Sequence, residues 1–316
     1  MGILLLLYTV TLTGQSFRFR ETVKRGFFEF ETPAMKGIIR ADGKVQGVAE
    51  LIDKETGRNL ARPLLPGFLS LYRIFSRGMR FRDPRTAPLK SLLRKGGEIL
   101  SLQWERLEEW PFELSCTFRI PGSRTLELTV EFTAEKDLQD FDLFVSNYVA
   151  LGFKHFLFLK RTLHLGGKQQ YDLFEPRATP FYKGCYLAFP RDHQAAKLFF
   201  DGRWLKPPHP VHWAIARHYA LPLVGSREEK TGLSVIIMAV RKECFALETT
   251  YAQEGRPDSV AGHNSIYLSL FGKTLRQGST ARMHLALHIT KLKSPAGAID
   301  LWRLWRRSVV GAEKRP

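Results

Sequence analysis

Three segments of the sequence combine aromatic rings with hydrogen-bonding side chains, a combination suited to binding a carbohydrate. Rings stack on the C–H faces of a sugar, and carboxylate, imidazole and amide groups bond its hydroxyls. Because the segments fall at comparable places between expected strands, we expect them to line one cleft, although each Trp could instead be a core residue and each His a surface or turn residue. The candidate substrate-binding side chains in these segments are Asp201, Trp204, His209, His212, His263 and Asn264.

A basic run could supply the counter-charge for an anionic ligand. The chain has 316 residues and a formal net charge of +17. Only Asp83 and Glu98 offset the run, and the planar fork of arginine matches carboxylate and sulfate oxygens, so Arg77 and Arg80 are further candidates for substrate binding. The alternative is a solvated loop whose arginines pair with nearby acids. No nucleic-acid motif accompanies the run, which makes nucleic acid the less favoured partner. The run consists of Arg73, Arg77, Arg80, Arg82, Arg85, Lys90, Arg94 and Lys95.

The sequence predicts neither a cofactor nor a metal. His209 and His212 form an HxxH pair, but Pro210 lies inside it and no third ligand is evident, which argues against zinc. Residues 272–274 (GKT) resemble the end of a phosphate-binding loop, but the required earlier glycine is absent. Three cysteines without a CxxC motif predict no disulfide framework.

Alternating apolar and polar residues predict β-strands along most of the chain. The strongest example is 126–132 (LELTVEF), and 17–20, 28–31, 267–271 and 283–289 continue the pattern. Turn signals such as Asp42-Gly43 and Pro121-Gly122 separate the runs. Strands without alternating helices predict an all-β fold, one large antiparallel β-sandwich.

Helical signals are few and lie mainly at the C-terminus. Residues 299–310 (IDLWRLWRRSVV) have the apolar spacing of an amphipathic helix, and 68–80 could hold a helical turn or two. Residues 3–10 (ILLLLYTV) have the length of a signal-peptide core but lack a positive region before it. We therefore divide the chain into 1–16, a first strand or signal-like segment, 17–298, a single β-sandwich domain, and 299–316, a C-terminal helix and basic tail.

The order of several segments resembles that of galactose-mutarotase-like (aldose 1-epimerase-like) proteins. The resemblance spans roughly residues 38–290 and depends on order and pattern rather than on one diagnostic motif. It implies a β-supersandwich with a concave sugar-binding surface. The segments are Asp42-Gly43 with 49–58, 104 with 110–114 and 126–132, 136–148, 245–248 (FALE) and 275–278 (LRQG).

The resemblance also implies a possible pair of catalytic residues. In that family a glutamate removes the proton of the anomeric hydroxyl and a histidine protonates the ring oxygen. Glu248 matches the base by order and context. Ser146 and Asn147 stand where the histidine is expected, and neither is an acid at neutral pH. The acid would then come from another segment, with His209, His212 and His263 as candidates.

The resulting hypothesis is a carbohydrate-binding mutarotase-like protein, catalytically inactive or acting on an unusual, acidic sugar. One alternative is a hexose mutarotase that uses Glu248. Another is a basic β module that binds nucleic acid or another polyanion. No membrane-spanning segment is expected, because no run of 18 apolar residues occurs. We favour a cytoplasmic location, with secretion as the alternative if 1–16 is a signal peptide.

Overall fold

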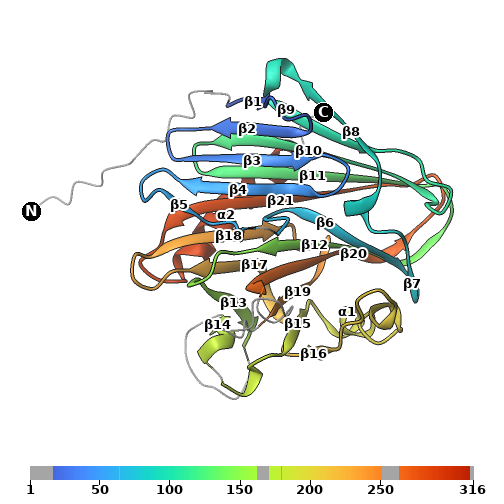
Figure 1. The fold of residues 1–316 in the computed structure, drawn as a ribbon. Helices are drawn as coiled ribbons and strands as arrows, with labels where there is room; N and C mark the ends of the chain where they lie inside the picture. Colours follow the sequence, from blue (N-terminus) through green and yellow to red (C-terminus); the bar gives the residue numbers. More distant parts are fainter. Residues whose placement is uncertain (1–16, 64, 162–170, 179, 251–262, 314–316) are drawn as a thin grey trace, which may run out of the picture.

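Three β-sheets make up most of the chain in the computed structural model, which describes residues 17–63, 65–161, 171–178, 180–250 and 263–313 (Figure 1). Within these residues the strands pair antiparallel, except for the parallel pair β15 and β16. In spatial order, the five-stranded sheet contains β1 (Phe19–Glu21), β2 (Phe27–Glu31), β3 (Met35–Ala41), β4 (Gln46–Asp53) and β5 (Arg58–Asn59). The seven-stranded sheet contains β16 (Trp213–Ile215), β15 (Tyr186–Pro190), β19 (Cys244–Thr250), β20 (Ser265–Leu275), β12 (Leu138–Tyr148), β6 (Ser70–Ser76) and β7 (Met79–Arg80). The nine-stranded sheet contains β14 (Tyr171–Phe174), β13 (Lys154–Lys160), β17 (Tyr219–Arg227), β18 (Leu233–Ala239), β21 (Thr280–Lys291), β11 (Thr125–Ala134), β10 (Phe112–Gly122), β9 (Ile99–Trp104) and β8 (Leu89–Arg94).

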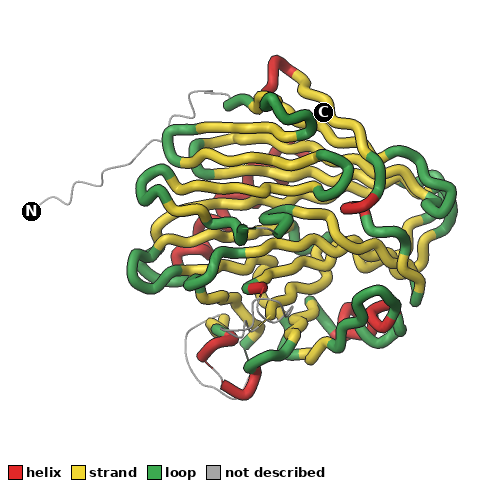
Figure 2. Tube along the Cα trace, in the orientation of Figure 1, coloured by secondary structure: helices red, strands yellow, loops and turns green. Residues whose placement is uncertain are grey.

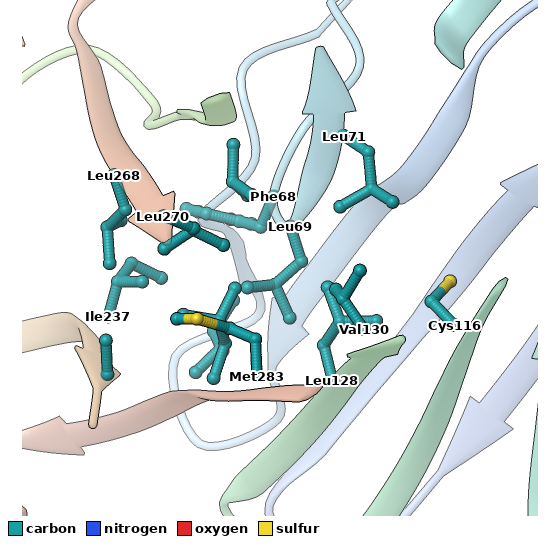
Figure 3. Close-up of a cluster of buried hydrophobic side chains, with 14 of the residues drawn as sticks. Phe68, Leu69, Leu71, Cys116, Leu128, Val130, Ile237, Leu268, Leu270 and Met283 are labelled. Carbon is teal, nitrogen blue, oxygen red and sulfur yellow. The ribbon is translucent and has the colours of Figure 1, made fainter. Parts of the chain in front are cut away.

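One hydrophobic cluster joins side chains from all three sheets. Figure 3 shows part of it, where Ile237 and Met283 of the nine-stranded sheet lie near Leu268 and Leu270 of the seven-stranded sheet. Isolated bridges link β4 to residue 68 and residue 61 to residue 149, so the five-stranded sheet adjoins the seven-stranded one. The expected all-β class and large antiparallel sandwich are therefore confirmed.

The outer face of the nine-stranded sheet is covered by the C-terminal helix α2 (Gly297–Glu313). Trp302 and Trp305 pack there against Phe156 and Ile236. The Trp302 Nε1 donates to the carbonyl of Ala239 at 3.1 Å. The predicted C-terminal amphipathic helix is confirmed, and no helix among the described residues is long and apolar enough to span a membrane.

The far face of the seven-stranded sheet, away from the main core, is covered by the segment that follows β15. This segment holds α1 (His193–Lys197) and a short 3₁₀ helix at Arg203–Leu205, and Figure 2 shows it as loops and helix at the lower right, below the strands. Phe199 and Trp204 of the segment pack on Phe144 of β12 and Tyr267 of β20. The remaining 3₁₀ helices are Pro84–Thr86, Lys95–Gly97, Pro176–Ala178 and Pro180–Tyr182.

Two local expectations were wrong, for related reasons. Residues 68–80 form strands β6 and β7 rather than helical turns, because a β-bulge at Tyr72 interrupts the alternation and gives Leu71 and Ile74 a helix-like spacing. Residues 267–271 were expected to be half-buried, but all five are buried because both faces of this sheet are covered. Within 265–271 the polar positions of β20 thus face an interior, whereas Lys273 and Thr274 further along the strand are exposed. Residues 1–16 lie outside the described part of the chain.

Candidate functional site

A cavity of about 270 Å³ lies on the far face of the seven-stranded sheet, under the segment that follows β15. Its floor comes from β6, β12 and β20, and its cover from the 204–213 segment. Aromatic rings dominate the lining, and those of Phe144 and Tyr267 are stacked with centroids 4.7 Å apart. Such a surface can stack on a ligand ring. The aromatic lining includes Tyr72, Phe144, Tyr148, Trp204, Trp213 and Tyr267.

The β-bulge in β6 places two consecutive side chains in this cavity. Arg73 pairs with Phe144 and Leu71 with Val145, so Tyr72 is the extra residue. In a regular strand consecutive side chains point to opposite faces, whereas here both Tyr72 and Arg73 line the cavity. The bulge therefore brings a guanidinium and a phenol to the site from adjacent positions in the sequence.

Arg85 is held in the cavity by two serine hydroxyls of the sheet floor. Its Nε donates to the Ser70 Oγ at 3.1 Å, and its Nη2 donates to the Ser146 Oγ. Ser146 lies opposite Ser70 in register, so both hydroxyls are on the cavity face. The Arg85 Cζ lies 3.8 Å from the centroid of the Tyr72 ring, a cation–π contact. These contacts fix the orientation of the guanidinium without neutralising it.

Arg73 is a buried charge that lacks a carboxylate partner in the described chain. Only 3% of its surface is exposed. Its Nη2 donates to the Tyr72 hydroxyl at 3.3 Å, while Nε and Nη1 make no hydrogen bond. The rings of Tyr72 and Trp204 lie 4.8 and 5.5 Å from its Cζ. Burying a charge without a counter-charge is costly, and the described chain supplies no carboxylate that offsets this cost for Arg73.

The cavity lining combines arginine and histidine side chains with no acidic side chain among the described residues. Among the described residues, the lining includes Arg73, Arg85, His209 and His263 and contains no Asp or Glu. His263 is half-buried, and its ring centroid lies 5.7 Å from that of Tyr148. Burial lowers the pKa of His263, with the Arg62 and Arg85 charges adding to the effect, so its imidazole is neutral at pH 7.

The carboxyl group of Glu248 is below the cavity rather than in its wall. Glu248 lies opposite Tyr267 in register, so its side chain is on the cavity face of the sheet, but it is wholly buried and does not line the cavity. Burial raises the pKa of Glu248 well above its ordinary value, and the hydroxyl of Ser269 opposes this only in part. Burial therefore favours the protonated form of this carboxyl group. It is a poor general base in this state, because a base must be ionised and within reach of the proton.

A buried ion cluster beside the cavity holds the covering segment in place. The Arg203 guanidinium lies 2.7 Å from the Asp201 carboxylate and 3.6 Å from that of Asp142, and its Nη2 donates to the carbonyl of Asp140. Burial raises the pKa of Asp142 to about 7, although the Arg203 charge lowers it. The cluster positions the adjacent Trp204 over Phe144, with ring centroids 4.8 Å apart.

The structure brings together three of the candidate binding residues and leaves the others outside the cavity. Trp204, His209 and His263 line it. The remaining candidates are engaged elsewhere or exposed: Asp201 binds Arg203, Asn264 donates to the carbonyls of Ala150 and Phe153, His212 is exposed, Arg77 lies 3.6 Å from Asp140, and Arg80 is bidentate with Asp83.

The basic run does not form a continuous cationic surface. Arg80 pairs with Asp83 at 2.7 Å, Lys90 lies 3.6 Å from Glu105, and a third pair joins Arg82 to an acid 3.9 Å away. These pairs agree with the solvated-loop alternative for most of the run. The exceptions are Arg73 and Arg85, which were not among the candidate site residues. Each is distinguished by a contact with a residue far away in the sequence, Arg73 with Trp204 and Arg85 with Ser146. The sequence alone does not reveal these contacts.

Comparisons with known proteins find similarity in structure only. No family model matches the sequence, and no curated protein matches it. Among solved structures, a putative aldose 1-epimerase from Escherichia coli K12 is 13% identical with a TM-score of 0.47, and the match covers 84% of this chain and 99% of that one. A galactose 1-epimerase from Lactobacillus acidophilus is 10% identical with a TM-score of 0.44, over 87% of this chain and 97% of that one.

A third match is a mutant heparan sulfate lyase from Pedobacter heparinus. It is 9% identical with a TM-score of 0.44, and the match covers 88% of this chain but 37% of the lyase. Two of the three proteins are epimerases of the kind that the order of segments in the sequence resembles. At these identities and TM-scores none of the three specifies a ligand for this chain, which must be argued from the cavity itself.

Proposed function

We propose that the cavity binds a sugar that carries a carboxylate or sulfate group. The observation that carries this proposal is the buried guanidinium of Arg73, which lines a cavity that has no acidic side chain among the described residues. The Arg85 guanidinium contacts the same Tyr72 ring as that of Arg73 and supplies a second positive charge. An anion in the cavity would supply the counter-charge that both groups lack.

The neutral part of the ligand is best accounted for by a sugar ring. Aromatic faces stack on sugar C–H groups, and the tyrosine hydroxyls offer hydrogen bonds to its hydroxyls. Burial raises the pKa of Tyr267 well above its usual range, so its phenol stays protonated and can donate. A purely aliphatic anion would leave this polar and aromatic lining unused.

The same geometry favours binding without mutarotation. Ring opening requires an ionised base at the anomeric hydroxyl and an acid at the ring oxygen. Burial raises the pKa of Glu248 and so disfavours its ionised form, while the lowered pKa of His263 leaves its imidazole neutral at pH 7. Within the described residues the cavity wall offers no carboxylate. We therefore assign the site to binding, and the alternative in which Glu248 acts as base remains an outcome of the test.

Two measurements on the wild-type protein test the proposal. A glycan array that contains uronic-acid, sulfated and neutral sugars should show binding to the acidic members. Polarimetry of freshly dissolved aldoses and uronic acids should show mutarotation at the uncatalysed rate. Binding to neutral sugars alone would contradict the assigned charge, and accelerated mutarotation that is lost in Glu248→Gln would restore the epimerase assignment.

A further inference from the structure

Three large apolar side chains are exposed at the rim of the covering segment. Phe200 is 72% exposed, Met79 55% and Leu205 54%. Met79 belongs to the short strand β7, Leu205 is the last residue of the 3₁₀ turn at Arg203–Leu205, and Phe200 precedes that turn. We call Met79, Phe200 and Leu205 the apolar rim.

Hydrogen bonds show that the chain segments carrying the three side chains are neighbours. The backbone N–H of Gly78 donates to the Asp201 carboxylate at 3.2 Å, which joins the residue before Met79 to the residue after Phe200. On the other side, the Arg80 Nη1 donates to the carbonyl of Lys206 at 3.5 Å, which joins the residue after Met79 to the residue after Leu205. Met79 is therefore held between the other two. Figure 1 shows the β7 hairpin next to the α1 loops.

Cationic side chains surround the apolar rim. Arg77, next to the β7 strand, is 69% exposed. Lys197 is one turn from Phe200, whose N–H donates to the Lys197 carbonyl at 3.1 Å, and Lys206 follows Leu205; both lysines are exposed. Neither lysine has an ion-pair partner among the described residues. The acidic groups nearby are already engaged, Asp201 by Arg203 and Asp140 by Arg77.

We propose that the apolar rim and its lysines dock on an anionic lipid surface. Apolar side chains that project from loops and are ringed by basic groups match the two parts of such a surface, because the side chains enter the acyl boundary while the lysines meet the negative headgroups. A glycan chain fits less well, since Met79 and Leu205 offer neither a stacking ring nor a hydrogen bond. A second copy of this chain fits less well too, because it would bring the same lysines together.

The rim is also connected to the cavity. The covering segment continues from Leu205 to His209, which lines the cavity. Docking at the rim would bring the covering segment of the cavity close to the membrane surface. The proposal does not depend on what the cavity binds, because its residues are different.

Vesicle co-sedimentation tests the proposal with the full chain. Vesicles of phosphatidylcholine alone are compared with vesicles that contain one third phosphatidylserine, at low and at high salt. The wild type should bind the anionic vesicles and be released by salt. The double variant Phe200→Ser with Leu205→Ser should bind them at least tenfold more weakly, since two inserting side chains are lost. Phe181→Ser removes a ring that is 84% exposed outside the rim and should bind like the wild type.

A charge-matched pair of variants tests the electrostatic part. Lys197→Gln with Lys206→Gln should weaken vesicle binding on the order of tenfold. Lys44→Gln with Lys293→Gln removes the same charge from exposed lysines outside the rim and should have little effect. Equal loss in both pairs, or absence of wild-type binding to anionic vesicles, would overturn the proposal.

Two further readouts separate the other outcomes. Analytical ultracentrifugation that shows a wild-type dimer, abolished by the rim variant, together with no vesicle binding would assign the rim to self-association instead. Array binding to acidic sugars should be retained in the rim variant. Loss of vesicle binding with retained sugar binding therefore separates this proposal from that for the cavity.

Discussion

Replacing Arg73 by Met should weaken anion binding while leaving the fold intact or more stable. The side chain is 97% buried, and the substitution keeps most of its length and apolar contacts while removing the charge. A charge-assisted hydrogen bond contributes about 1.5–3 kcal/mol, so affinity for a uronic acid should fall roughly tenfold to hundredfold. Affinity for a neutral sugar should change little, because the aromatic lining remains.

The expected stability change has the opposite sign. In the free protein two nitrogens of the guanidinium are buried without a hydrogen bond. The change removes this cost but also the bond to the Tyr72 hydroxyl and the contact with its ring. We expect the free energy of unfolding in urea to stay the same or to rise by on the order of 1 kcal/mol.

Isothermal titration calorimetry and urea unfolding on the same preparations provide the assay. Arg77→Met is the matched control, since Arg77 is 69% exposed, pairs with Asp140 and lies outside the cavity. It should alter neither quantity measurably. Unchanged uronate affinity in Arg73→Met, or an equal loss for neutral and acidic sugars, would refute the assignment of Arg73 to the ligand's anionic group.

Three further substitutions test the surrounding structure. Glu248→Gln should have a higher melting temperature than the wild type at pH 7, and the two melting temperatures should converge below pH 4.5. The reason is that a carboxyl pKa raised by folding lowers the stability of the wild type as the pH rises from the ordinary pKa of 4.5 toward the pKa in the folded protein. A constant difference in melting temperature across this range would contradict the raised pKa of the buried carboxyl group. Trp305→Phe deletes the 2.9 Å bond to Glu127 under α2 and should cost about 1–3 kcal/mol in urea unfolding, whereas no loss would show that α2 docks without it. Gly67→Ala would place its Cβ 1.7 Å from a carbonyl oxygen of β4 at a φ of +73°, and it should largely prevent folding, as judged by soluble yield and circular dichroism. The control Gly43→Ala also has a positive φ but has open space around its Cβ, so it should lower the free energy of unfolding by only about 1 kcal/mol. Similar losses in both variants would contradict the close approach of β4 to Gly67.

The sequence predicted the regular strands and the C-terminal helix well because their burial is simple. In β11, Leu126, Leu128, Val130 and Phe132 all face the core, so the alternation of residue types equals the alternation of environments. Helix α2 likewise has one buried face, which contains Trp302 and leaves the spacing of its apolar residues easy to recognise.

The strands that build the site were harder to interpret. In β6 the bulge at Tyr72 breaks the alternation, and in β20 both faces are covered, so polar residues such as Ser269 are buried. The local alternation of residue types does not reveal that the segment after β15 covers the second face of this sheet. The bulge in β6 is also what places Arg73 in the cavity.

Residue type predicted part of the site, and tertiary pairing decided the rest. Trp204, His209 and His263 were expected to share a cleft and do line one cavity. Among the arginines of the basic run, composition could not distinguish Arg80, which meets Asp83 three residues along the chain, from Arg85, which meets serines of two different strands. That difference depends on which strands become neighbours.

The most direct test of the central claim compares two ligands that differ only at one carbon. Methyl β-glucuronide and methyl β-glucoside share a ring and an aglycone, but only the first has a carboxylate. Calorimetric titration of the wild-type protein with each should give measurable binding of the glucuronide and at least tenfold weaker binding of the glucoside, because Arg73 and Arg85 have no counter-charge without the carboxylate. If the array shows binding of a different acidic sugar, the titration instead compares that sugar with its neutral analogue, in which an alcohol replaces the acidic group. Equal affinities, or tighter binding of the neutral member, would contradict an anion-binding cavity.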